Sequence, residues 1–191
     1  MSEDRIKLKN VVGHFRTITR HRHEVIRNCF KAGIGFQGLF HDLSKYSPEE
    51  FLNGCRYYQG TRSPHEGERD DNGYSKAWMH HKGRNKHHYE YWIDYCIDPV
   101  DGHVTTGGNK MPKKYVAEMV CDRIAACRVY QGDKYTSASP YDYYQRSKGS
   151  ILIHPDTSDL LDRWLLLLKD KDETDALAQI RAELRDKNFP Y

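Results

Sequence analysis

Residues 11–30 read VVGHFRTITRHRHEVIRNCF, and the spacing of their apolar side chains decides the fold class. One stripe of an α-helix would carry Val11, Phe15, Ile18, Val25 and Cys29. A second segment with this period covers residues 112–130, and further helices are expected at 48–58, 74–96, 140–146, 155–169 and 172–187. Few segments alternate between apolar and polar residues, so we predict an all-α helical bundle with loops at 60–73 and 98–112.

The clearest helix start lies at Ser47 and Pro48. Serine is a favoured N-cap residue, and proline is favoured at the first helical position. Glu50 stands three residues after Ser47, which is the spacing of a capping box. The sequence therefore predicts that Glu50 serves this helix end.

Size and composition indicate one globular unit. The chain has 191 residues, of which 38% are hydrophobic and 30% are charged, which excludes a collagen-like or disordered chain. We expect a single domain over residues 1–191, with a core at about 10–135 and C-terminal helices at 151–191 packed on it. The apolar face of segment 155–169 would serve a homodimer contact equally well.

Charge and cysteine content limit which binding partners and which cellular compartment we expect. The net charge is +3, below the strongly basic balance of a dedicated nucleic-acid binder, so a nucleic-acid partner is possible but not indicated. Five cysteines without a C-x-x-C pair predict reduced thiols. No apolar run approaches the about 18–20 residues of a membrane span, and no secretory signal opens the sequence. We therefore expect a cytoplasmic protein with no membrane partner.

The sharpest chemical motif is the dipeptide His41-Asp42 within GLFHDLSK, residues 38–45. An imidazole beside a carboxylate offers nitrogen and oxygen ligands, where a divalent metal can bind if other helices add ligands. Alone, such a pair is more often a helix-terminal histidine followed by an aspartate that resembles an N-cap. On helix 11–30, His21 and His23 are further candidates, and both lie about 100° from the centre of the apolar stripe, on opposite flanks. Helical spacing alone does not choose between them.

Residues 78–92, WMHHKGRNKHHYEYW, are rich in histidine and cations. In a continuous helix, one face would carry His81, Asn85, His88 and Trp92. The neighbouring face would carry His80, Arg84, His87 and Tyr91. Gly83 weakens this helix and marks a bend. The segment suits phosphate binding, and its alternative is a solvated basic helix that contacts an acidic partner.

Asp122 stands among apolar residues of helix 112–130. Aspartate is rarely buried unless it is paired with a cation, so Asp122 requires a partner. That partner is either a metal ion or an ordinary ion pair with Arg123 or Arg128.

In chain order, these motifs resemble the HD-domain superfamily of metal-dependent phosphohydrolases. The matching residues are His21-x-x-x-Val25, Leu39-Phe-His41-Asp42-Leu-Ser-Lys45, His81, His88 and Asp122-x-Ile-Ala. The first ligand histidine of that superfamily is typically followed four residues later by an apolar residue, which fits His21 and not His23. Over about residues 10–155 the chain also resembles an uncharacterised family of bacterial and phage proteins, a domain of unknown function.

The resemblance implies an HD-like helical bundle with a divalent-metal site. One ion would be held by His21, His41, Asp42 and Asp122. His81 and His88 would bind a second ion bridged by Asp42, or the phosphate of a substrate. His80 and His87 stand in reserve for this role.

This resemblance implies a phosphohydrolase that acts on a nucleotide or another small phosphate ester. One or two ions of Mn, Fe, Co, Ni or Zn would polarise a phosphoryl oxygen and activate water. Asp42 would orient the reacting groups, while Lys45 and Arg84 would balance charge on the phosphoryl oxygens. The expected substrate contacts are Lys45, Arg84, Asn85, Lys86 and His87.

Two other functions are compatible with the same residues. A minor HD branch uses four histidines and two aspartates to hold two irons and oxidise a C–H bond, and this chain has enough ligands for that chemistry. Alternatively, the metal stabilises a non-catalytic binding protein that contacts a partner through tyrosine and tryptophan side chains. Metal identity separates the two enzymes, because bound iron with oxygen-dependent turnover favours the oxygenase.

Overall fold

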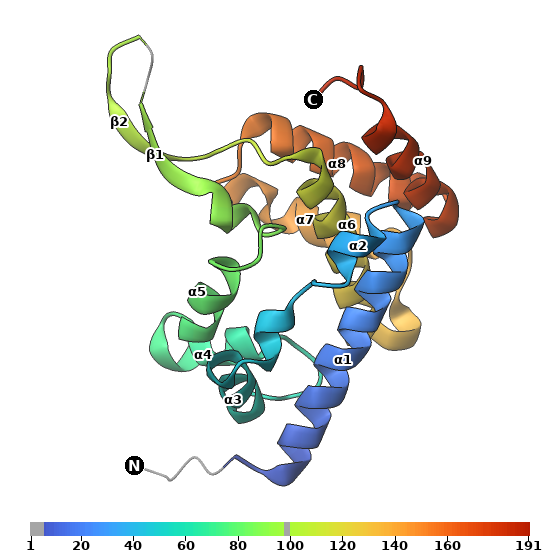
Figure 1. Cartoon of the computed structure of the whole chain (residues 1–191). Coiled ribbons are helices and arrows are strands. Elements are labelled where there is room, and N and C mark those ends of the chain that lie inside the picture. Colours follow the sequence, from blue (N-terminus) through green and yellow to red (C-terminus); the bar gives the residue numbers. More distant parts are fainter. Residues whose placement is uncertain (1–5, 98–99) are drawn as a thin grey trace.

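The computed structural model describes residues 6–97 and 100–191, and helices dominate these residues (Figure 1). The long helix α1, Leu8–Lys31, forms where the apolar period predicts it. Its buried face consists of His14, Ile18, His21, Val25, Asn28 and Cys29. The expected stripe is wrong in the first half of the helix, where Phe15 is 49% exposed and His14 is buried in its place.

The reason is the helix α3, Pro48–Arg56, which packs on the first half of α1. The ring of His14 lies 5.4 Å from that of Phe51, between centroids. A Cβ atom at position 54 would overlap the His14 ring, so Gly54 permits the close approach of the two helices. Packing with α3 therefore rotates the buried face of α1 toward His14 and His21.

Short elements connect α1 to the histidine-rich segment. They are α2 (Gly35–Gly38), the 3-10 helix η1 (Leu43–Tyr46), α3, α4 (Pro64–Asn72) and α5 (Lys76–Lys82). The loop expected at 60–73 is wrong, because α4 occupies most of it. Its signals were present in the sequence, since Pro64 is the first residue of the helix and Gly73 adopts the left-handed conformation that ends it.

The continuous helix expected at 74–96 is also wrong. The helix α5 ends at Gly83, and Asn85 donates a hydrogen bond back to the His81 carbonyl oxygen. A 3-10 helix, η2 (Tyr89–Trp92), then leads into the strand β1 (Ile93–Ile97), which pairs antiparallel with β2 (Val104–Gly108). This hairpin projects from the helices (Figure 1) and occupies part of the loop expected at 98–112, of which residues 98–99 lie outside the described residues.

The C-terminal half builds the apolar core around α6, Lys113–Gln131. It continues through the 3-10 helix η3 (Gly132–Lys134), α7 (Ser139–Ser147), the 3-10 helix η4 (Lys148–Ser150), α8 (Pro155–Asp170) and α9 (Glu173–Arg185). Residues 116–121 of α6 are all buried, because α1, α7, α8 and α9 pack around this helix. The apolar face of α8, with Leu161 and Trp164, thus packs into the hydrophobic core of this same chain. Within the described residues, no helix is long and apolar enough to cross a bilayer.

Leu161 offers a direct test of this core. Leu161 is completely buried, whereas Leu166 on the same helix is 39% exposed. We expect Leu161→Ala to lower the free energy of unfolding by about 3 kcal/mol, since it leaves a cavity in a close-packed region. Leu166→Ala should cost less than about 1 kcal/mol. Urea titrations of both variants measure the difference, and equal losses would contradict the assigned packing.

Candidate metal centre

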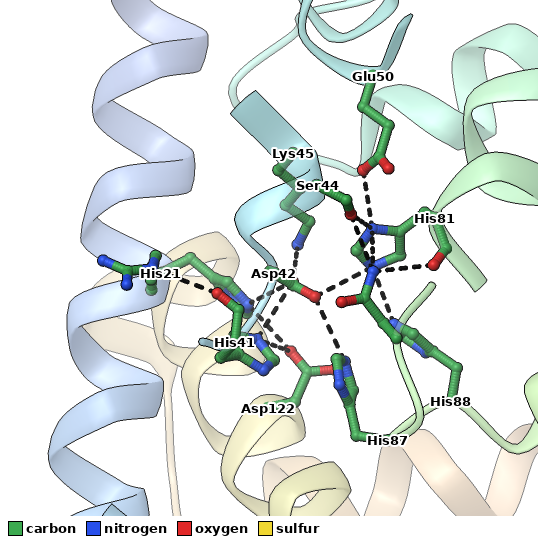
Figure 2. Close-up of polar contacts among 12 residues, drawn as sticks. His21, His41, Asp42, Ser44, Lys45, Glu50, His81, His87, His88 and Asp122 are labelled. Carbon is green, nitrogen blue, oxygen red and sulfur yellow. Dashed lines mark hydrogen bonds and ion pairs between the residues drawn. The ribbon is translucent and has the colours of Figure 1, made fainter. Parts of the chain in front are cut away.

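Asp42 lies in the turn between α2 and η1, in an unusual backbone conformation. Its φ of 52° makes it the one non-glycine residue with positive φ in the described part of the chain. This left-handed conformation costs about 1 kcal/mol for most residues, and aspartate tolerates it better than most. Arg22 of α1 holds the turn in place by donating hydrogen bonds to the carbonyl oxygens of Leu39 and His41. The turn directs the Asp42 carboxylate between α1, α5 and α6 (Figure 2).

A first group of ligand atoms surrounds one oxygen of Asp42. It consists of His21 on α1, His41 and Asp42 in the turn between α2 and η1, and Asp122 on α6. The ligand atoms of these four residues lie within 4.8 Å of one another. The Nε2 atom of His41 is 3.1 Å from Asp42 Oδ2, and that of His21 is 3.0 Å from Asp122 Oδ1. Two imidazoles and two carboxylates at this spacing are a donor set that could hold a divalent transition metal.

A second group of ligand atoms surrounds the other oxygen of Asp42. It consists of Asp42, His81, His87 and His88, within the same 4.8 Å limit. His81 Nε2 and His87 Nε2 lie 3.3 and 3.5 Å from Asp42 Oδ1, and His88 Nε2 lies 2.9 Å from His81 Nε2. Figure 2 shows the carboxylate between the two groups. The geometry thus suits two ions with Asp42 as the shared ligand.

Unsatisfied buried atoms gather in these two groups. The buried atoms without a well-formed hydrogen bond in the described residues include the Nε2 atoms of His21, His41 and His87 and both carboxylate oxygens of Asp42. A lysine also approaches this carboxylate, because the Nζ atom of Lys45 is 2.6 Å from Asp42 Oδ2. Buried polar atoms without partners are costly, and here they all point toward common centres. The donor set therefore fits a divalent cation.

Two buried glutamates orient the histidines through contacts with their Nδ1 atoms. Glu118 Oε1 lies 2.9 Å from His41 Nδ1 and 3.3 Å from His87 Nδ1, and Glu50 Oε2 lies 2.8 Å from His81 Nδ1. An ionised carboxylate only accepts hydrogen bonds, so it holds the proton on Nδ1 and leaves the Nε2 lone pair facing the centre.

Neither glutamate was predicted from the sequence to contact the histidines. Glu118 lies one helical turn before Asp122 on an apolar helix, which was the available signal. The capping-box role of Glu50 is wrong, because the Ser47 side chain forms no cap and Glu50 instead contacts His80 and His81.

The charges of the centre reinforce one another. Burial favours the neutral form of Asp42, but His41, Lys45 and His81 outweigh it and hold the pKa of this carboxyl well below its usual range. Burial likewise opposes a charge on His41, yet Asp42, Glu118 and Asp122 raise the pKa of His41 to about 10, so a metal ion bound at Nε2 would displace the proton held there. Burial lowers the pKa values of His21 and His88, which leaves lone pairs available for a metal. The buried carboxylates therefore need cationic partners nearby to remain ionised.

A cavity of about 490 Å³ opens next to the centre. Its walls include His21, Lys45, His81, His88 and Asp122, so both groups of ligands border it. Beyond the ligands, the lining contains aromatic rings and three arginines, namely Trp78, Tyr89, Tyr130, Tyr143, Arg62, Arg69 and Arg123. The volume and the mixed lining are typical of a site for a small organic molecule.

The structure brings the six predicted metal ligands together and adds His87. His23 is exposed on the outer side of α1, so the position of His21 matches the choice that the resemblance implied. Because the chain turns at Gly83, Arg84 and Lys86 point outward and do not line the cavity. Asn85 is buried and bonds Ser44 and the His81 carbonyl oxygen.

The fold and the site together define a helical protein with a buried His/Asp cluster suited to divalent metal ions. The chain belongs to DUF5662, a family of unknown function, whose model matches residues 10–166. Comparison with curated proteins and with solved structures yields no match.

Metal content tests the shared ligand. We expect tag-free protein to hold up to two equivalents of Mn²⁺ or Zn²⁺, and Asp42→Asn to lose both, because one charge serves both groups. Asparagine also tolerates the left-handed backbone, so the substitution isolates the charge. His23→Gln, an exposed histidine on the same helix, should keep the wild-type content. Elemental analysis after dialysis measures this, and full metal content in Asp42→Asn would refute the shared role.

His14 provides a test by pH. Burial, aided by the Lys45 charge, lowers the pKa of His14 to about 4 from 6.5. Between these values the unfolded chain binds a proton that the folded chain does not, so the free energy of unfolding decreases as the pH falls. From pH 7 to pH 5, the wild type should lose about 2 kcal/mol more than His14→Gln. Denaturant titrations at both pH values decide this, and parallel losses would contradict it.

Proposed function

We propose that this protein is a divalent-metal-dependent phosphohydrolase that acts on a small phosphate ester, such as a nucleotide. The observation that carries the proposal is the Asp42 carboxylate, with one oxygen facing each of two groups of ligands that border a cavity whose lining includes a lysine and three arginines as well as acidic side chains. The resemblance of the His/Asp motifs to HD-domain phosphohydrolases supports the same reaction class. When bound, the ions supply Lewis acidity and lower the pKa of a bound water toward about 7.

The side chains of the site would orient the ligands and stabilise charge on the substrate. Asp42 joins the two halves of the site, and Glu118 and Glu50 keep the histidine lone pairs directed inward. Lys45 borders the cavity and places its ammonium beside Asp42, where it would meet a phosphoryl oxygen. The burial of Asp42, Glu50 and Glu118 strengthens their electrostatic contacts.

Arg123 is the best-placed cation for the rest of an anionic substrate. Its guanidinium lies over the Tyr144 ring, 5.3 Å from the centroid, and its buried Nε has no hydrogen-bond partner in the described residues. Arg123 lines the same cavity as Asp122, its neighbour on α6. In this respect Arg123 replaces Arg84 and Lys86 as the proposed phosphate ligand.

Arginine side chains in the cavity favour the hydrolase over the di-iron oxygenase. Oxidation of a C–H bond requires no cations around the substrate, whereas a phosphate ester does. The two enzymes also differ in the metal that supports turnover.

Phosphate release from a panel of nucleoside phosphates, with Mn²⁺, Co²⁺, Ni²⁺ or Zn²⁺ added, tests the reaction. We expect turnover by the wild type and by His23→Gln, none by Asp42→Asn, and a kcat/KM lower by about tenfold to a hundredfold for Arg123→Gln, which loses a charged hydrogen bond. Iron-dependent oxygen uptake would favour the oxygenase. A metal-loaded protein that releases no phosphate from any ester would overturn the proposal.

A further inference from the structure

The outer face of α1 carries a row of cations that the metal centre does not use. The helix contains six Lys or Arg and one Glu, a net charge of +5, while the whole chain carries +3, so the remainder is at −2. At 100° per residue, the side chains of one row fall within about 40° of one another. This cationic row consists of Lys9, Arg16, Arg20 and Arg27.

The cationic row is long and poorly neutralised. It extends over about 27 Å from Lys9 to Arg27, at 1.5 Å per residue. Arg27 pairs with Glu24 at 2.9 Å, but within the described residues no ion pair involves Lys9, Arg16 or Arg20. All four cations are exposed and lie opposite the buried face that holds His14 and His21.

Exposed aromatic side chains lie to one side of the cationic row. Around α1, Phe30 lies about 60° and Phe15 about 120° from the row on the same side. The helix α2, which packs on α1, adds Phe36, and the following turn adds Phe40. Their exposed fractions are 49%, 57%, 78% and 59% in chain order. Phe36 contacts Phe40, and Phe30 lies against Gly35. We call these four phenylalanines the aromatic row.

From this arrangement we infer that the outer face of α1 and α2 binds single-stranded nucleic acid. The phosphates would follow the cationic row, and unstacked bases would lie on the aromatic row. A duplex keeps its bases stacked and would use the cations alone. A membrane-surface helix places its apolar side at the centre of the contact and its cations at the flanks, whereas here the cations themselves occupy the most outward direction of α1. The inference is independent of the proposed reaction.

Fluorescence anisotropy with 5′-fluorescein (dT)20 and (rU)20 tests the inference, and comparing the two oligonucleotides separates DNA from RNA. We expect Arg16→Glu/Arg20→Glu to weaken binding at least about tenfold and to reduce the slope of log affinity against log salt by about 1.4, because two phosphate contacts are lost. The matched control Lys134→Glu/Lys187→Glu changes the net charge equally at exposed sites elsewhere. It should bind as the wild type does, and an equal loss would mean that net charge alone governs binding.

Further variants separate the aromatic row and the metal cavity from the cationic row. Phe15→Ala/Phe36→Ala should weaken single-strand binding while leaving the salt slope unchanged. Asp42→Asn should bind the oligonucleotides as the wild type does, which excludes the cavity as their site. No binding at 50 mM salt, or equal affinity for a duplex of the same length, would overturn the inference. So would binding restricted to phosphatidylserine vesicles, which would assign the face to membranes.

Discussion

The carboxylate of Asp42 is the constraint on which the centre depends. It is 1% exposed and charged, and five histidines and a lysine converge on it or on its neighbour Asp122 from separate parts of the chain. A buried charge is stable only when partners compensate it, so the surrounding elements must all be present at once. The left-handed turn, the Arg22 contacts and the short helix η1 all serve to hold this one side chain in place.

The helices that supply ligands also build the core, so the site and the fold share their parts. On α6, Cys121 and Ile124 face the apolar core, while Glu118 and Asp122 face the histidines. On α1, Val25 and Cys29 continue the stripe that contains His21. The helices α8 and α9 contribute no ligand, but they fix the position of α6. Stability and metal binding are therefore expected to respond together to changes in α6.

The period of apolar residues was sufficient to predict the helical fold class and the long helices, because such a local repeat marks the buried face of a helix. The sequence offered His41, Asp42 and Asp122 as separate candidate ligands, and only the resemblance to HD-domain proteins joined them into one site. Contacts between residues far apart in the sequence could not be predicted from a local pattern. Glu118 contacts a histidine 77 positions earlier, and Glu50 contacts one 31 positions later. The course of residues 83–92 was missed because Asn85 side-chain bonding and the turn at Gly83 compete with helix propensity.

The two halves of the centre rest on scaffolds of different stiffness. His21 and Asp122 belong to helices of 24 and 19 residues, whereas His81 belongs to a helix of seven, and His87 and His88 follow it in an irregular turn. Short helices and turns open locally at lower free energy than long, well-packed helices. The half built by α1 and α6 is thus preorganised, while the other half assembles around it. We therefore expect two ions to bind in sequence, first in the half built by α1 and α6 and then in the half that contains His81, His87 and His88.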